Sequence, residues 1–252
     1  MSLSPSYIAR PDEILAGVIV PYDMALDSEM WRWAPDGVSL LFTRTPYAAM
    51  PVTVEMAELV GDESAIEQCT RDLLTARPAV YAYACTSGSF VNGLKGERRL
   101  VETMRTAGKA EAVTTSGALL AALTRLGVRR VATATPYDAQ VTERLTTFLE
   151  EADVEVVSSA HLGLSQEIWT VPYEQTLQLV RDADSAEAEA IFVSCTNLAT
   201  YDVIAPLEAE LGKPVITANQ VTMWAMLEAL DRRAVGPHQW LIVGPGSFRE
   251  DS

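Results

Sequence analysis

The chain has 252 residues, of which 48% are hydrophobic and 21% are charged, and these proportions are typical of an ordinary soluble globular protein. They exclude a disordered or fibrous chain, and no apolar run is long enough to span a bilayer. The formal net charge of −15 would repel a phosphate backbone, so neither a nucleic acid nor a membrane is an expected partner.

Short apolar runs alternate with longer amphipathic stretches along the whole length, which predicts βα units around parallel sheets. The predicted strands cover residues 14–20, 37–44, 79–85, 110–114, 129–134, 154–160, 190–195 and 214–218. Between them apolar residues recur at helical spacing, as in Ile66, Cys69 and Leu73. Cys69 is therefore expected to be a small buried side chain of the core.

The two halves of the chain resemble each other, because four predicted strands precede residue 118 and four follow it. The third strand of each half ends in the same way, with Cys85-Thr86 in one half and Cys195-Thr196 in the other. We expect an α/β fold with two pseudo-symmetric lobes, each a four-stranded parallel sheet flanked by helices. The predicted lobes are residues 1–117 plus 219–252 and residues 118–218, the last helix returning to the first half.

The three cysteines form an odd set with no close pairing, which is poor material for a disulfide framework. The first ten residues show no cationic start followed by an apolar run, so no export signal is expected. We therefore expect reduced thiols and a cytoplasmic location.

Several cofactor motifs are missing from the sequence. No G-x-G-x-x-G follows the first predicted strand, no Walker A loop is present, and the two histidines are far apart with no clustered Cys/His spacing. Neither a cofactor nor a metal is expected. Ser87-Gly88-Ser89 lacks the G-x-S-x-G frame of a hydrolase, although His161, near the same predicted sheet edge, leaves that chemistry open.

Cys85 and Cys195 are the strongest candidates for chemistry. Each follows an apolar strand and precedes hydroxyl residues that lead towards a helix, where backbone N–H groups would lower the pKa of a thiol. Parallel sheets bind ligands beyond the carboxyl ends of their strands, so both thiols would enter one site if the halves face each other. One thiol could then attack or deprotonate a carbon beside a carboxylate while the other delivers a proton. This pattern indicates a cofactor-independent racemase or isomerase with hydroxyls, including that of Thr196, as anion ligands.

Three segments resemble the aspartate/glutamate racemase superfamily, in the branch of maleate cis-trans isomerase, arylmalonate decarboxylase and the ectoine-utilisation isomerase-like proteins. They are residues 85–90 (CTSGSF), residues 126–137 (LGVRRVATATPY) and the stretch from Ser194-Cys195-Thr196 through Leu207-Glu208 to Pro214-Val215. The resemblance covers roughly residues 14–232. It implies two facing lobes with the active site between them, no cofactor, and a possible homo-oligomer.

The resemblance also implies roles for single residues. Cys85 and Cys195 resemble the two catalytic cysteines, Thr86 and Ser87 resemble hydroxyls that hold a substrate carboxylate, and Tyr137 resembles a tyrosine of the anion pocket. Arylmalonate decarboxylases carry glycine in place of Cys85, so the presence of both thiols favours isomerisation or racemisation. By similarity to maleate isomerases, Cys85 is the nucleophile and Cys195 the acid/base partner.

Two positions depart from the maleate isomerase pattern. Asp23 lies just after Pro21, where those enzymes usually have an asparagine, and it would oppose a dianion unless turned away or protonated. It could instead recognise an amine or amide, which would suit an amino-acid or ectoine-derived substrate. The loop 162–169 lacks a second expected asparagine, for which Gln166 is a weak substitute.

The leading hypothesis is therefore an isomerase or racemase of a small carboxylate, with maleate to fumarate conversion as the best named reaction. One alternative is an arylmalonate-type decarboxylase that uses Cys195, and another is a racemase of an amino acid or ectoine derivative. A rival from a different class is a non-catalytic carboxylate-binding protein.

Overall fold

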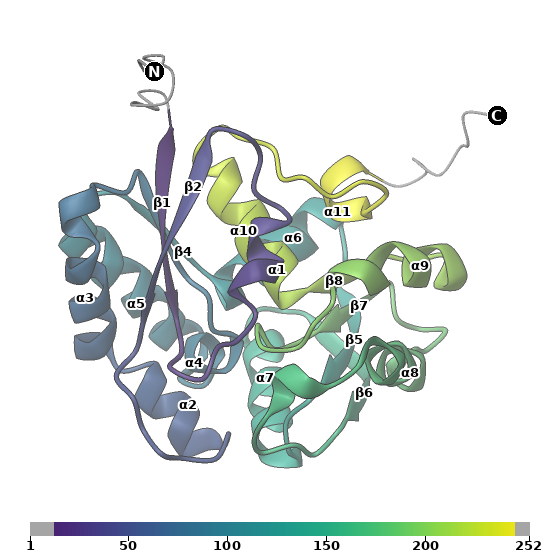
Figure 1. Cartoon of the computed structure of the whole chain (residues 1–252). Helices are drawn as coiled ribbons and strands as arrows, with labels where there is room; N and C mark the ends of the chain where they lie inside the picture. Colours follow the sequence, from purple (N-terminus) through teal and green to yellow (C-terminus); the bar gives the residue numbers. More distant parts are fainter. Residues whose placement is uncertain (1–12, 245–252) are drawn as a thin grey trace.

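A computed structural model describes residues 13–244 (Figure 1). The first ten residues, on which the expectation about an export signal depends, lie outside this range, as do the outer ends of the first predicted lobe. Within the described residues no helix is both long and apolar enough to cross a membrane.

Eight parallel strands form two four-stranded sheets, which confirms the predicted fold class. The strand orders are β2-β1-β3-β4 and β6-β5-β7-β8, so the two sheets have the same topology. The strands are β1 (Ile14–Val20), β2 (Val38–Arg44), β3 (Val80–Tyr83), β4 (Glu111–Thr114), β5 (Arg130–Thr135), β6 (Glu155–His161), β7 (Ala190–Val193) and β8 (Val215–Thr217).

Helices flank both sheets, because amphipathic segments between the strands bury their apolar faces against them (Figure 1). Helices α3 and α5 cover the first sheet, α8 and α9 lie beside the second, and α6 and α10 lie between the two. The helices are α1 (Asp27–Trp31), α2 (Val54–Val60), α3 (Glu63–Asp72), α4 (Thr86–Phe90), α5 (Gly93–Gly108), α6 (Thr115–Leu126), α7 (Ala139–Glu151), α8 (Tyr173–Ala183), α9 (Tyr201–Leu211), α10 (Ala218–Glu228) and α11 (Trp240–Val243).

Helices α6 and α10 occupy equivalent places in the two halves and pack against each other. Each begins directly after the last strand of its half, with a threonine cap, Thr114 or Thr217, that accepts a hydrogen bond from a backbone N–H of the first turn. The hydroxyls of Thr115 and Thr222 are 2.7 Å apart across the joint. Helix α10 also contacts β3 and β4 of the first sheet, while the exact lobe boundaries stay a prediction.

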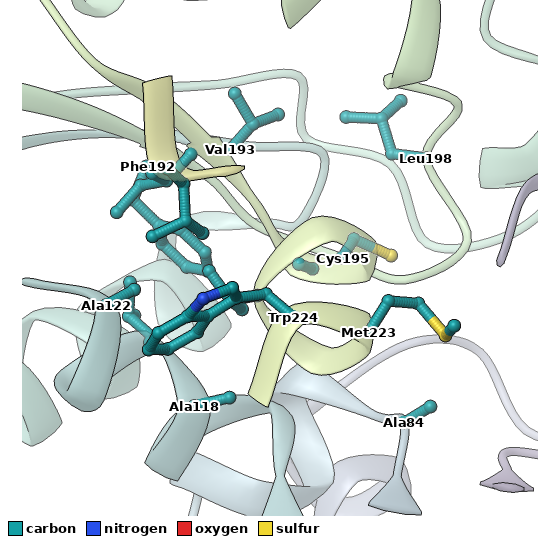
Figure 2. Close-up of a cluster of buried hydrophobic side chains, with 14 of the residues drawn as sticks. Ala84, Ala118, Ala122, Phe192, Val193, Cys195, Leu198, Met223 and Trp224 are labelled. Atoms are coloured by element: carbon teal, nitrogen blue, oxygen red, sulfur yellow. The ribbon is translucent and has the colours of Figure 1, made fainter. Parts of the chain in front are cut away.

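A single large core extends across both sheets. Figure 2 shows its centre, where Trp224 of α10 lies beside Ala118 and Ala122 of α6, close to Phe192 of β7. A second, smaller cluster fills the space between the first sheet and α3 and α5, and it contains Cys69, whose side chain is 2% exposed. The expectation that Cys69 is a buried core residue is confirmed.

Strands β3 and β7 each end two residues earlier than predicted, which places both candidate cysteines outside the strands. Strand β3 ends at Tyr83 and β7 ends at Val193, because their neighbours β4 and β8 end at the paired residues and turn into helices. Cys85 and Cys195 therefore lie in the turns beyond the sheets and not in the strands themselves.

Candidate active site

One pocket between the two lobes is lined by all seven predicted site residues, at the carboxyl ends of the strands. They are Asp23, Cys85, Thr86, Ser87, Tyr137, Cys195 and Thr196. The pocket holds about 310 Å³ of empty space, counting the part open to solvent. The remaining lining residues are Pro21, Val52, Met56, Ile168 and Asn197.

Cys85 is the N-cap residue of α4, so its thiol lies over the first turn of a helix. The backbone N–H of Gly88 donates to the Cys85 Sγ at 3.4 Å, and the Ser87 hydroxyl is 3.9 Å from the same sulfur. Burial nevertheless raises the pKa of this thiol above its usual value, although Gly88, the Tyr83 hydroxyl and Ser87 act in the opposite direction. The predicted fall in the pKa of Cys85 is therefore wrong.

Cys195 occupies the equivalent turn of the second lobe, with a positive φ of 89° that non-glycine residues rarely adopt. The backbone N–H of Asn197 donates to its Sγ at 3.4 Å. Burial raises the pKa of Cys195 to about 12, against the opposing effects of the Tyr137 hydroxyl and the Asn197 N–H. Here too desolvation outweighs the nearby N–H donor, so the predicted fall in pKa is wrong, and both thiols are neutral at pH 7.

A direct hydrogen bond joins the two cysteine turns. The backbone N–H of Cys195 donates to the Thr86 hydroxyl at 3.3 Å, so Thr86 links the lobes as well as lining the pocket. The unusual backbone at Cys195 is consistent with this contact, since a strained residue persists where its surroundings hold it.

The pocket offers neutral hydrogen-bonding groups to an anion. The hydroxyl of Tyr137 accepts a hydrogen bond from Ser194 at 3.4 Å, and burial raises the pKa of Tyr137 well above its usual value, so it keeps its proton. Among the residues that the structure describes, no lysine, arginine or histidine lines the pocket. A carboxylate would therefore be held by hydroxyls and backbone N–H groups, which need no counter-charge.

Asn197 is a functional candidate that the sequence reasoning missed. Its Nδ2 donates to the backbone carbonyl of Asp23 at 2.9 Å, and its Oδ1 accepts from the N–H of Ala25 at 2.9 Å. This side chain of the second lobe thus holds the turn of the first lobe that carries Asp23. The available signal was its position two residues after Cys195, next to Thr196.

Asp23 is half-buried at the pocket wall, and burial raises the pKa of its carboxyl. The Asp23 charge in turn contributes to the raised pKa values of Cys85 and Cys195, after the larger effect of burial. The carboxylate thus acts electrostatically on both thiols.

Apolar residues from the segments that follow β2 and β6 complete the pocket. Val52 and Met56 follow β2, and Ile168 comes from the loop after β6. The N–H of Val52 donates to the carbonyl of Ser165 at 2.7 Å, which ties the two segments together across the lobes. The other two candidates left open, His161 and Gln166, are exposed and do not line this pocket.

Comparison with known proteins gives a consistent result. The family model described as arylmalonate decarboxylase matches residues 36–239. A maleate isomerase from Geobacillus stearothermophilus is 27% identical, over 75% of this chain and 78% of that relative. The arylmalonate decarboxylase of Bordetella bronchiseptica is 31% identical, over 82% of this chain and 87% of that relative.

Solved structures of related enzymes indicate the same family. The crystal structure of a maleate isomerase from Pseudomonas putida superposes with a TM-score of 0.83 at 25% identity, covering 93% of this chain and 99% of that one. The branch predicted from residues 85–90, 126–137 and 194–215 is therefore confirmed. With the family model covering most of its length, this chain belongs to the arylmalonate decarboxylase family.

Proposed function

We propose that this protein is a cofactor-independent cis-trans isomerase of a small unsaturated carboxylate, with maleate to fumarate as the best named reaction. The observation that carries the proposal is the pair of buried thiols, Cys85 and Cys195, which reach one small pocket from equivalent turns of the two lobes. The curated maleate isomerases among its relatives support the same reaction.

The roles of the two cysteines follow from the chemistry of an alkene beside a carboxylate. With its proton released to solvent, the Cys85 sulfur forms a bond to one alkene carbon, and the π electron pair moves to the adjacent carbon and its carboxylate. The thiol of Cys195 then transfers its proton to that adjacent carbon and becomes a thiolate. The central bond is now single and can rotate.

The reverse steps complete the turnover. The Cys195 thiolate removes the proton again, the electron pair re-forms the double bond in the trans geometry, and the Cys85 carbon–sulfur bond breaks. Each atom and electron pair is thereby returned, so no redox partner is required. The hydroxyls of Thr86, Ser87 and Tyr137 would hold the carboxylate and stabilise the negative charge that develops on it.

Decarboxylation of a substituted malonate is the second candidate. It is favoured by the 31% identity to an arylmalonate decarboxylase, and by the apolar wall of Val52, Met56 and Ile168, which could pack against an aryl group. In that reaction Cys195 alone would protonate the carbanion left by departing carbon dioxide, and Cys85 would have no required role.

Proton NMR with maleate in deuterated buffer tests the proposal. The wild-type protein should form fumarate, whereas Cys85→Ala and Cys195→Ala should each lower turnover by at least 1,000-fold, because each removes a reacting atom. Cys69→Ala is the matched control, since Cys69 is equally buried but lies outside the pocket. Full activity in Cys85→Ala would overturn the two-thiol mechanism, and carbon dioxide released from an arylmalonate by that variant would support the decarboxylase.

A further inference from the structure

Asp23 lines the pocket, and its charge acts on both thiols, so it is an unfavourable neighbour for a substrate with two carboxylates. It lies in the turn after β1, and Asn197 holds the backbone of this turn through Asp23 and Ala25. Because both hydrogen bonds come from the other lobe, the turn cannot move away from the pocket without separating the lobes at this point.

No cation offsets the Asp23 carboxylate within the described residues. The titratable groups that it acts on are the thiols of Cys85 and Cys195 and the phenols of Tyr22 and Tyr83, and none of these is basic. The nearby Arg44 is engaged elsewhere, with its guanidinium on the Asp27 carboxylate and the Met24 carbonyl.

The pocket therefore offers a ligand two unlike kinds of group, neutral hydroxyls and a carboxyl. The hydroxyls of Thr86, Ser87 and Tyr137 can accommodate one carboxylate. A second carboxylate beside an ionised Asp23 would place like charges together in a partly desolvated site, and such a contact is unfavourable. A group with N–H donors would instead form a charge-assisted hydrogen bond to Asp23.

The proposed reaction favours an amide over an ammonium as the N–H group that contacts Asp23. A conjugated amide carbonyl accepts electron density better than a carboxylate anion, so it makes the double bond more open to attack by a thiol, whereas an ammonium group on saturated carbon adds no second acceptor. We propose that Asp23 selects a cis-unsaturated acid that carries one carboxylate and one primary amide, in preference to the symmetrical dianion. The alkene in this statement rests on the proposed function, whereas the selection by Asp23 concerns binding alone.

The pH dependence of the selection has a defined sign. When the pH falls and Asp23 takes up a proton, the neutral carboxyl can donate a hydrogen bond to a carboxylate. Binding of a dianion should therefore strengthen as the pH is lowered, and burial moves this change to a higher pH than for an ordinary aspartate. Asparagine at this position should remove the change, because its amide donates at every pH.

Binding of saturated analogues tests the selection without depending on turnover. Isothermal calorimetry at pH 8 would compare succinamate, with one amide, and succinate, with two carboxylates. The wild-type protein should bind succinamate at least tenfold more tightly. In Asp23→Asn, and in the smaller Asp23→Ser, this preference should fall to threefold or less. The exposed Asp36→Asn, which removes one negative charge outside the pocket, should keep it.

Two results would overturn the inference: equal or tighter binding of succinate by the wild type, or a preference for succinamate that survives in both Asp23 variants. Thermal melts of each variant would verify that the fold is retained. A parallel NMR assay with maleamate and maleate separates this inference from the proposed function. Preference for succinamate without isomerisation of either cis acid would refute the isomerase and leave the selection standing.

Discussion

At the scale of single residues, the two candidate thiols combine opposite influences. Backbone N–H groups contact the sulfur atoms of Cys85 and Cys195, yet burial dominates and raises both pKa values above the ordinary value of 9.0. At pH values below its pKa, the ionised fraction of a thiol rises about tenfold for each pH unit. We therefore predict that alkylation of Cys195 by iodoacetamide, followed by mass spectrometry, accelerates about tenfold per unit between pH 7 and 9, and that alkylation of Cys85 also accelerates over this range. A rate that is already constant across this range would show that the thiols are ionised at neutral pH.

At the scale of elements, a buried carboxyl on α9 connects two later segments. Glu208 accepts hydrogen bonds from the N–H of Val215 at the start of β8 and of Trp240 at the start of α11. Burial raises the pKa of Glu208 from 4.5 to about 8. The folded protein thus keeps a proton that the unfolded chain has lost, so this contribution to stability is complete below pH 4.5 and is lost as the pH rises through about 8.

Glu208→Gln should accordingly flatten the decline of stability with pH. Between pH 5 and 8 the free energy of unfolding of the wild type should fall relative to the variant, by up to about 1.4 kcal/mol per pH unit. Denaturant melts at several pH values measure this slope, which is unaffected by any constant cost of the amide. Parallel slopes for the two proteins would mean that Glu208 is already ionised in the fold.

At the scale of the whole molecule, one continuous core joins the two sheets through α6 and α10. Polar links reinforce it, including Asn197 to the Asp23 turn and Cys195 to Thr86. We therefore predict that the lobes unfold together, in a single transition at the same urea concentration by far-UV circular dichroism and by tryptophan fluorescence. Two separated transitions would show that each lobe is stable alone, and that the site can open by separation of the lobes.

Much of the fold was predictable from local patterns. Apolar runs such as 14–20 and 190–195 are readable because a central strand of a parallel sheet is buried on both faces and excludes polar residues over its whole length. The ends of β3 and β7 could not be predicted in this way. A strand stops where its neighbour stops, and the neighbour depends on residues far away in the chain. The helical spacing around Cys69 sufficed to place it in the core.

The candidate site was predictable to the extent that its residues follow strand ends. All seven predicted residues line one pocket, because equivalent turns of two parallel sheets can face each other. Val52, Met56 and Ile168 carry no such signal, since segments of different lobes bring them together, whereas the position of Asn197 two residues after Cys195 was an available signal. The catalytic roles of the predicted residues stay a prediction until the variants are assayed.

The sequence by itself determined the βα alternation, the internal duplication and the pair of cysteines beyond equivalent strands, because these depend on local periodicity and on the types of neighbouring residues. Only the tertiary structure decided that the thiols are held neutral, that Asn197 holds the Asp23 turn from the opposite lobe, and that no cation of the described residues lines the pocket. Desolvation and charge balance are set by every group that surrounds an atom, and those groups come from segments that are distant in the chain.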